Sequence, residues 1–360
     1  MFRRHPRLLS NTFLFASGWS PATHWISTQL LVTKVFCTII TSSHLGYAEA
    51  LAKSLHAHGD DYLLYVLVVD SDSRDRSRPG FKVLSLPEVD CELSGLLARR
   101  YLDSGKHNEF RWSMKSVLLL HLLGREKAGK VIFVDPDIAF FKDPRFLFDL
   151  LDSSNVLLTP HWRCNDPSKD PVNFRLLMTE GHFNAGFVAV SSGAEEALEW
   201  WARICLGRCE RARSEGLFVD QSYLNLFPVY FDKVRIMRHR GCNVANWNLE
   251  MNRRELSDGK VKINGNDPVV FIHFTNSTIR GILRGEDEHL RPHLVQWLEW
   301  RGVGLESVAH LAAAPAAGTG SKVRRSLVHR ARKRLFRLAA HLAEDIKPWM
   351  KSSPKQTPPH

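Results

Sequence analysis

The stretch Val-Ile-Phe-Val-Asp-Pro-Asp-Ile-Ala-Phe-Phe-Lys-Asp-Pro (131–144) decides the fold class of this 360-residue chain. Its first four residues, 131–134, predict a buried strand, which ends at Asp135, Pro136 and Asp137. A continuous apolar run is typical of a parallel sheet that is covered on both faces. Residues two apart in an extended chain point the same way, and Pro136 keeps Asp135 extended. The stretch therefore predicts two carboxylates side by side at the carboxyl end of a strand, where ligands of open α/β sheets bind.

Apolar strands and amphipathic helices alternate on both sides of this stretch. Strands are expected at 35–41, 62–70, 131–134, 156–159, 183–190, 230–237 and 269–274. Helices are expected at 45–55, 109–123, 194–206, 220–226 and 290–301. This alternation predicts the α/β class, with a Rossmann-like, mostly parallel mixed sheet flanked by helices.

The composition excludes several classes of protein. With 44% hydrophobic residues, 20 Phe and 10 Trp, the chain can bury a large core and is neither wholly disordered nor fibrous. Six cysteines in 360 residues are too few for a disulfide-stapled scaffold and suggest a reducing compartment. No run of about 18 apolar residues occurs, so no membrane-spanning helix is expected.

The positive charge is concentrated at the end of the chain. The net charge is +11, and residues 321–360 hold eleven Lys or Arg against two acidic residues, a net charge of +9. The first 320 residues therefore carry only about +2. A nearly neutral body argues against nucleic acid as a partner, since a binding core for it would itself be basic.

Composition divides the chain into four parts. We expect an N-terminal extension over 1–33, a main domain over 34–303, a linker over 304–321 and a basic amphipathic tail over 322–360. Polar residues interrupt the apolar stretch of the extension, so a secretory signal is not favoured and a cytoplasmic location is expected.

The tail predicts a C-terminal amphipathic helix over 322–349. Apolar side chains share one face of that helix, and arginines crowd the rest: the apolar positions are Leu327, Ala331, Leu335, Leu338, Leu342 and Ile346. Two interpretations stay open. The helix is either a solvated basic segment or an interfacial helix that holds the protein peripherally on an anionic membrane, at its inner face.

Asp135 and Asp137 are candidate ligands of a divalent cation. Two carboxylates held on one side of a rigid turn repel each other, and a cation removes that repulsion. Mg²⁺ and Mn²⁺ prefer oxygen ligands and bind one or two carboxylates together with phosphate oxygens. A rival pair, Asp70 and Asp72, also ends an apolar strand. The alternative for that pair is turn or capping chemistry, and the local pattern does not separate the two pairs.

Four blocks in a fixed order resemble the nucleotide-sugar glycosyltransferases of the GT-A fold, most closely the retaining family 8 type. They are 131–144, GHFNAGFVAV (181–190), FVDQSYLNLFP (218–228) and VVFIHF (269–274). The resemblance covers roughly residues 34–300. It implies a GT-A-like fold with the catalytic domain in 34–303. It also implies metal-dependent transfer of a sugar, with retention, from a UDP-linked donor to a glycan or lipid-linked acceptor.

The resemblance also implies roles for single residues. Asp135, Asp137 and His273 match the metal ligands, for Mn²⁺ or Mg²⁺, and an imidazole suits Mn²⁺ better. Asn184, Asp220 and Gln221 match the residues that hold the reacting sugar. The alternatives are a core histidine for His273, an Asn tolerated in a turn for Asn184, and a helix N-cap for Asp220.

For the donor, the resemblance implies contacts with a nucleotide and its diphosphate. Thr41, Ser42 and Tyr47 stand where the base and ribose should lie, although the first loop lacks the acidic residue usual in the family. Lys115 matches the cation near the donor, with Arg111 as the alternative. The family's Lys-Pro-Trp after the metal His is absent, so Arg280 is expected at the diphosphate, with Arg284 as its substitute. Asp135 is expected to contact the donor as well.

Two features outside this set leave alternatives open. Asn243, Trp247 and Asn248 are typical either of the wall of a sugar pocket or of a buried core. A nucleotidyl- or phosphotransferase would use the same metal–diphosphate chemistry, although no Gly-rich phosphate loop occurs. A basic nucleic-acid-binding protein is the further alternative, but no such motif is present.

Overall fold

The structure is a computed structural model that describes residues 33–71 and 76–313. The expected extension over 1–33, except its last residue, and the basic helix over 322–349 lie outside the described residues. Asp72, one of the rival aspartates, lies outside them too.

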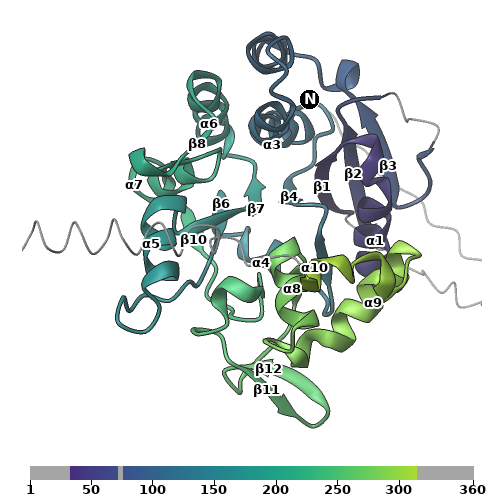
Figure 1. The fold of residues 1–360 in the computed structure, drawn as a ribbon. Helices are drawn as coiled ribbons and strands as arrows, with labels where there is room; N and C mark the ends of the chain where they lie inside the picture. Colours follow the sequence, from purple (N-terminus) through teal and green to yellow (C-terminus); the bar gives the residue numbers. More distant parts are fainter. Residues whose placement is uncertain (1–32, 72–75, 314–360) are drawn as a thin grey trace, which may run out of the picture. The chain divides into compact units, whose positions relative to one another are not determined.

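A seven-stranded mixed sheet forms the centre of the fold, in the order β10-β6-β7-β4-β1-β2-β3 (Figure 1). Its strands are β1 Lys34–Ile40, β2 Tyr62–Val68, β3 Phe81–Ser85, β4 Lys130–Val134, β6 Val156–Pro160, β7 Phe183–Ser191 and β10 Val234–Ile236. All neighbours pair in parallel except β7, which runs antiparallel to β4 and β6. The predicted α/β class, with a mostly parallel sheet, is confirmed.

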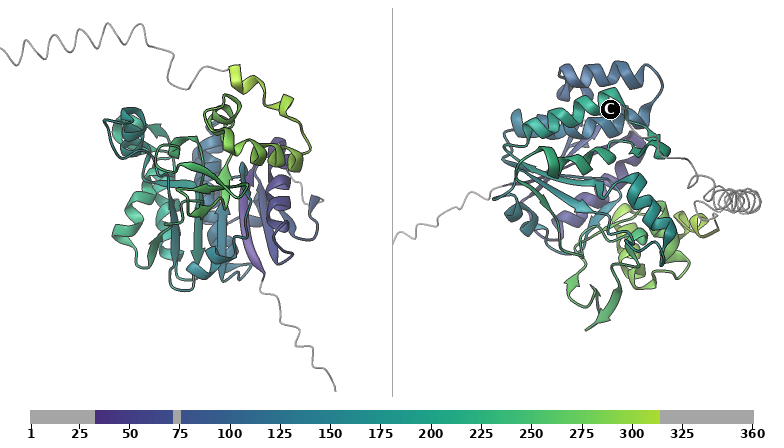
Figure 2. Two further views of the ribbon diagram at one scale, coloured as in Figure 1. Left: turned by 90° about the horizontal axis from the view of Figure 1, so that it is seen from below. Right: turned by 90° about the vertical axis from the view of Figure 1, so that its left-hand side faces the viewer.

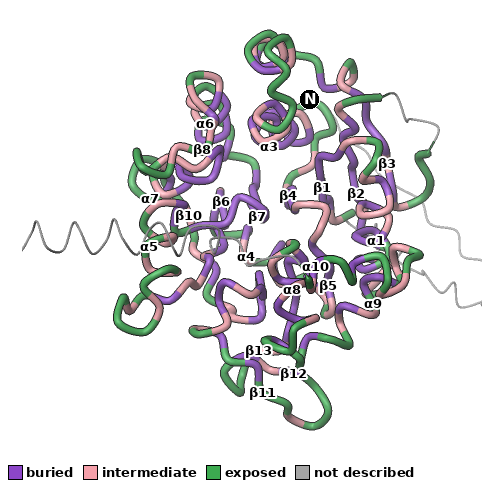
Figure 3. The backbone as a smooth tube through the Cα atoms, in the orientation of Figure 1, coloured by how far each residue is buried: buried purple, intermediate pink, exposed green. Residues whose placement is uncertain are grey.

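Both faces of the sheet are covered by helices, as the two views of Figure 2 show. In β1, Val35, Cys37 and Ile39 pack on the side of helices α3 (His107–Gly124) and α6 (Glu195–Gly207), whereas Phe36 and Ile40 pack on the side of helix α1 (Leu45–His56). This burial on both faces explains why the strands are continuously apolar instead of alternating. Figure 3 shows the buried strands at the centre and the exposed chain at the periphery.

The described helices are α1 Leu45–His56, α2 Glu92–Leu97, α3 His107–Gly124, α4 Arg145–Leu150, α5 Pro171–Glu180, α6 Glu195–Gly207, α7 Phe227–Tyr230, α8 Asn276–Leu283, α9 Arg291–Arg301 and α10 His310–Ala313. Of these, α1, α3, α6 and α9 match the helices expected at 45–55, 109–123, 194–206 and 290–301, and the rest were not predicted. In the parts of the chain that the structure describes, no helix combines the length and the apolar character needed to cross a bilayer.

Three smaller sheets complete the fold. They are β5 Ile138–Phe140 with β14 Phe271–His273, β8 Arg211–Ala212 with β9 Leu217–Phe218, and β11 Arg254–Ser257 with β12 Lys260–Ile263 and β13 Asp267–Pro268. All their pairings are antiparallel. The β5–β14 pair matters for function, because it returns the chain after β13 to the end of β4.

Some elements differ from the sequence prediction. The strand expected at 230–237 is only Val234–Ile236, because Pro228 lies in the first turn of the short helix α7 and favours helix there. The expected helix 220–226 is a 3-10 turn over Ser222–Leu226. The linker expected from residue 304 begins instead as a 3-10 turn and α10, since Val308 and Leu311 are buried in the same apolar cluster as α8 and α9.

Candidate active site

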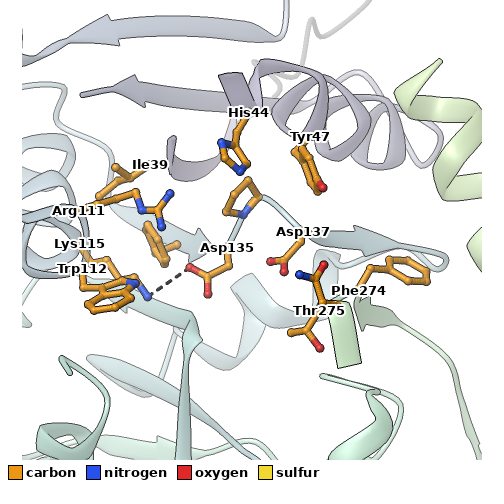
Figure 4. Close-up of a pocket in the computed structure, with 13 residues that line it drawn as sticks. Ile39, His44, Tyr47, Arg111, Trp112, Lys115, Asp135, Asp137, Phe274 and Thr275 are labelled. Atoms are coloured by element: carbon orange, nitrogen blue, oxygen red, sulfur yellow. Dashed lines mark ion pairs between the residues drawn. The ribbon is translucent and has the colours of Figure 1, made fainter. Parts of the chain in front are cut away.

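Asp135, Asp137 and His273 form a cluster with the geometry of a metal site. One ligand atom from each lies within 4.8 Å of the other two, and the group is the only such set of three or more found among the described residues. His273 Nε2 lies 3.0 Å from Asp137 Oδ1 and 3.9 Å from Asp135 Oδ2. The two aspartates are half-buried and His273 is buried. Figure 4 shows both aspartates facing a common cavity.

Strand pairing brings these three residues together. Asp135 follows β4, and its backbone N–H donates to the carbonyl of Gly186 in β7 (2.8 Å). The chain turns at Pro136 and Asp137 into β5, whose antiparallel pairing with β14 sets His273 opposite Ile138. Phe274 N–H then donates to the carbonyl of Asp137 (2.8 Å). Backbone hydrogen bonds thus hold Asp137 and His273 beside each other, although they are 136 positions apart in the chain.

Gly186 leaves room for the cluster. A Cβ atom at this position would lie 2.7 Å from His273 Cε1, 2.8 Å from Asp135 Oδ2 and 2.9 Å from Asn184 Oδ1. Real Cβ atoms do not approach other heavy atoms so closely. The glycine in Phe-Asn-Ala-Gly is therefore required by the space around the carboxylates and the imidazole.

Charge couples His273 to the aspartates. Burial lowers the pKa of His273, but the carboxylate of Asp137, through its charge and hydrogen bond, raises that pKa above its ordinary value. Burial raises the pKa of Asp137, yet the imidazole beside it brings that pKa below its usual range. The pair therefore forms an ion pair in the absence of another cation, and a metal would displace the proton of His273.

Lys115 of α3 joins the metal cluster to a buried carboxylate. Its ammonium lies 3.2 Å from Asp135 Oδ1 and 3.3 Å from Asp220 Oδ2, and it donates to the carbonyl of Ala185 (3.0 Å). Burial lowers the pKa of Lys115, but the two carboxylates raise it above the usual value. Asp220 is 1% exposed, and burial raises its pKa to about 6 despite the opposing charge of Lys115. Asp220 Oδ2 has the ion pair but no hydrogen bond.

Asn184 and Gln221 lie beside this cluster and are held by the chain. Asn184 lies in β7, not in a turn; its Oδ1 accepts from Gly186 N–H (2.7 Å), and its Nδ2 lies 3.2 Å from His273 Nδ1. Gln221 Oε1 accepts from Ala185 N–H (3.3 Å), and its Nε2 donates to the carbonyl of Glu180 (2.8 Å). No side chain caps the 3-10 turn after Asp220, so the capping alternative is wrong.

The backbone before Asp220 is strained. Val219 has φ of 47°, in the left-handed region that β-branched residues rarely adopt. Its N–H donates to the carbonyl of Glu210 (2.9 Å), and its carbonyl precedes the buried Asp220. Such strain persists only where surrounding contacts determine the conformation, and it concentrates at functional sites.

A cavity of about 330 Å³ opens beside the aspartates (Figure 4). Aromatic and cationic side chains from α1, α3 and the segment after β14 line it together with the turn after β4: Ile39, His44, Tyr47, Arg111, Trp112, Lys115, Phe133, Asp135, Pro136, Asp137, Phe274, Thr275 and Asn276. The expected donor residues Tyr47, Lys115 and Asp135 are among them. The sequence analysis missed His44, although it stands in the first loop after β1, where a ligand is expected.

Thr41 and Ser42 lie in that first loop but do not line the cavity. Thr41 Oγ1 bonds with His44 Nδ1 (2.8 Å), and Ser42 donates to Asp70 from its N–H (2.7 Å) and its hydroxyl (3.1 Å). Burial, and then the charge of Arg111, lower the pKa of His44. Asp70, the first of the rival aspartates, therefore ties the loop to the end of β2.

Arg280 does not reach the cavity, which corrects the expected diphosphate contact. Thr275 caps α8 by accepting from Thr278 N–H (3.2 Å), and the helix directs Arg280 Nε to the carbonyl of Leu311 (3.3 Å). Its substitute Arg284 is directed to the carbonyl of Ala312 (3.0 Å). Arg111, the earlier alternative to Lys115, lines the cavity instead.

Asn243, Trp247 and Asn248 lie behind the cluster and not on the wall of the cavity. Asn243 Oδ1 accepts from Asn184 (3.0 Å), and the ring of Trp247 meets the ring of His273 edge-on, with 5.4 Å between centroids. Asn248 donates to the carbonyls of Asn243 (2.8 Å) and His161 (3.3 Å). These residues position His273 and Asn184 by packing, as the buried-core alternative expected.

No protein-family model matches the chain. Two uncharacterized proteins of Bacillus subtilis (strain 168) are similar to it. YfnF is 28% identical over 256 residues, which cover 70% of this chain and 84% of YfnF. YfnD is 29% identical over 251 residues, which cover 68% of this chain and 78% of YfnD.

Solved structures with a similar fold include three transferases. The glycosyltransferase GlyE of Streptococcus pneumoniae TIGR4 is 14% identical with a TM-score of 0.44 over 78% of this chain, which spans only 62% of GlyE. Mouse xyloside xylosyltransferase 1 is 13% identical, with a TM-score of 0.44 over 69% of this chain and 99% of its own. The galactosyltransferase LgtC is 15% identical, with a TM-score of 0.40 over 74% and 95%.

Proposed function

We propose that this chain is a metal-dependent glycosyltransferase, which moves a sugar from a nucleoside diphosphate to a glycan or lipid-linked acceptor. One observation carries the proposal. Two carboxylates and an imidazole converge within 4.8 Å beside a cavity that also holds Tyr47 and the cation Lys115. A diphosphate needs positive charge, and a nucleobase needs an aromatic surface. The proposed donor is UDP-linked, as the resemblance of the four sequence blocks implies.

The residues present fit a divalent cation. Asp135, Asp137 and His273 supply two oxygen ligands and one nitrogen, a set that suits Mn²⁺ better than Mg²⁺. The space above Gly186 is free of any Cβ atom, so the three side chains can close around one ion. When bound, the cation would supply a counter-charge for the leaving diphosphate.

Side chains of α3 would neutralise the remaining negative charge of the diphosphate. Arg111 lines the cavity one turn before Lys115, and its guanidinium would take the diphosphate role first assigned to Arg280. Cationic donors held in place before the reaction stabilise charge as it develops, without reorganisation. A strong general acid is then not needed for the leaving group.

Asn184, Asp220 and Gln221 would hold the sugar at the other side of Lys115. Asp220 keeps an oxygen without a hydrogen bond, which can accept from a sugar hydroxyl. Its negative charge would also support the positive character that the anomeric carbon gains. The oxygen and the nitrogen of the Gln221 amide both bond to the backbone, which makes a covalent role for this side chain unfavourable. Retention by front-side attack is the stereochemistry that we propose.

The decisive experiment is thermal unfolding of the full chain against a panel of nucleotide sugars, with and without Mn²⁺. We expect one UDP sugar to raise the melting temperature only when Mn²⁺ is present. Asp137→Ala should remove that shift and abolish transfer, while the far-ultraviolet circular dichroism stays as in the wild type. If oligonucleotides alone stabilise the protein, the glycosyltransferase proposal fails. The same holds if Asp137→Ala retains wild-type transfer with the metal chelated.

A further inference from the structure

Arg211 contacts Trp112, a residue of the cavity wall, and also lies near the ring of Phe218, over which Arg213 lies as well. Arg211 is an exposed residue of β8, and its guanidinium carbon lies 5.0 Å from the ring centroid of Trp112 and 5.7 Å from that of Phe218. Trp112 itself lines the cavity from α3, beside Lys115 (Figure 4). The two rings restrict a side chain that would otherwise be free to rotate, and stacking leaves the N–H groups in the guanidinium plane available.

Arg211 differs from the arginines around it in having no acidic partner. Arg208 pairs with Glu210 and Glu215, and Arg213 pairs with Glu180. Within the described ranges 33–71 and 76–313, no carboxylate lies within 4.0 Å of Arg211. A positive charge without a paired carboxylate in the described ranges therefore lies against Trp112, a residue of the cavity wall.

We propose that Arg211 binds an anionic group, a phosphate or a carboxylate, on the acceptor sugar. This inference rests on the proposed glycosyltransferase function and names the class of acceptor. A stacked guanidinium matches both groups with two parallel hydrogen bonds, and such charge-assisted pairs are stronger than neutral ones.

The position of two carboxylates assigns this charge to the acceptor and not to the donor sugar. The donor sugar would lie against Asp220 and Asp135, which would repel a negative substituent there. Arg211 contacts Trp112 and is itself exposed, so a second substrate can reach it from solvent. The acceptor is therefore the substrate whose charge this side chain can meet.

The test is a binding titration of the full chain with glucose 6-phosphate, glucuronate and methyl glucoside, followed by ligand-observed NMR. It is run at constant ionic strength, with and without UDP and Mn²⁺. We expect at least one of the two anionic sugars to bind about tenfold more tightly than the neutral one, as one charge-assisted hydrogen-bond pair allows. Arg211→Gln should abolish this preference. Arg253→Gln, which removes the same charge from an exposed position beside β11, should retain it.

Three results would overturn the proposal. The anionic sugars bind no more tightly than methyl glucoside, or Arg211→Gln keeps their advantage. The third result is that Arg211→Gln lowers the affinity for UDP-glucuronate relative to UDP-glucose and leaves the affinities for the free sugars unchanged. That result would assign the contact of Arg211 to the donor sugar. UDP binding is recorded separately. If the wild-type protein does not bind UDP, the proposed glycosyltransferase function fails, whatever the result with the free sugars.

Discussion

The two ends of the cavity are built differently. At the metal end, His273, Asn184, Lys115 and Asp220 are buried, and each bonds to at least one other residue of the cluster or to its backbone. On the side of the loop after β1, the lining residues His44 and Tyr47 are only half-buried, and the neighbouring Ser42, which does not line the cavity, is exposed. One end is part of the core, whereas the other is a surface loop.

This difference separates the effects expected from substitution. A change at the metal end disturbs packing and charge inside the protein, so stability and activity should fall together. A change at the loop end alters contacts that water can replace, so it should affect ligand affinity and leave stability nearly unchanged. The predictions that follow test this separation, from the largest effect to the smallest.

Gly186→Ala should have the largest effect. Its Cβ would lie within 2.9 Å of atoms of His273, Asp135 and Asn184, so these side chains must move apart. We expect a loss of transfer of roughly 10²-fold or more, because a displacement of about 1 Å at a reacting centre has that effect. The Mn²⁺-dependent shift in melting temperature should vanish as well.

Gly124→Ala is the matched control for that variant. Gly124 is the last residue of α3, and a Cβ there meets nothing within 4 Å. We expect unchanged transfer and a slightly higher melting temperature, because alanine favours helix over glycine by roughly 0.5–1 kcal/mol. Wild-type metal dependence in Gly186→Ala would show that the cluster is not confined as described.

Lys115→Met should affect stability and activity together. The substitution leaves Asp220 buried beside Asp135 without its cation, and breaking one partner of a buried ion pair costs about 3–5 kcal/mol. Denaturant unfolding would measure this loss, and transfer should fall with it. Lys82→Met breaks the exposed pair with Glu126 and should cost less than about 1 kcal/mol. Equal losses of unfolding free energy in Lys115→Met and Lys82→Met would contradict the view that the buried metal end contributes more to stability than an exposed ion pair.

Metal binding should depend on pH through His273. Because the pKa of His273 is raised, the metal-free protein keeps a proton there to a higher pH than a free imidazole does, and a metal must displace that proton. Affinity for Mn²⁺, measured by calorimetry, should therefore fall about tenfold per pH unit as pH drops below that pKa. His273→Gln should flatten this dependence. A pH-independent affinity in the wild type would exclude the imidazole as a ligand.

The same pKa has a consequence for the stability of the metal-free protein. The folded-state pKa of His273 lies above its unfolded value of about 6.5. While Asp137 is ionised, the ion pair therefore stabilises the fold fully below about pH 6.5. This contribution is lost as pH rises through the raised pKa of His273, and again as pH falls through the lowered pKa of Asp137. Metal binding strengthens over the upper of these ranges, in which His273 loses its proton, so added Mn²⁺ should restore stability there.

The sequence predicted most of the buried strands and named Asp135, Asp137 and His273 as candidate metal ligands, but it did not show how they meet. Apolar runs such as 131–134 can be recognised in the sequence, because a strand that is buried on both faces needs apolar side chains at every position. The proximity of His273 to Asp137 depends on the pairing of β5 with β14. β5 has only three residues, so it gives no periodic signal, and the pairing spans more than 130 residues of chain. Only the family resemblance linked these positions.

The Arg280 expectation arose where the sequence departs from the family pattern. The family places a cation soon after its metal histidine, but here Thr275 begins helix α8 at that point and carries Arg280 away from the cavity. A threonine followed three residues later by another polar residue is a recognisable helix start, and it could have corrected the assignment. The bond between Ser42 and Asp70 has no comparable signal, because it joins the ends of two adjacent strands through tertiary structure.

Asp70→Asn should have the smallest effect and tests the loop end alone. Asp70 accepts from the N–H and the hydroxyl of Ser42, and the neutral amide would weaken both bonds without leaving a buried charge. Because both residues are exposed, the free energy of unfolding should change by less than about 0.5 kcal/mol. The loop that carries His44 and Tyr47 would become less ordered, so the KM for the nucleotide sugar should rise about threefold to tenfold with kcat nearly constant, a loss of uniform binding. A fall in kcat as large as that of Lys115→Met would mean that the two ends act as one unit, and the distinction between a rigid metal end and an adaptable nucleotide end would be wrong.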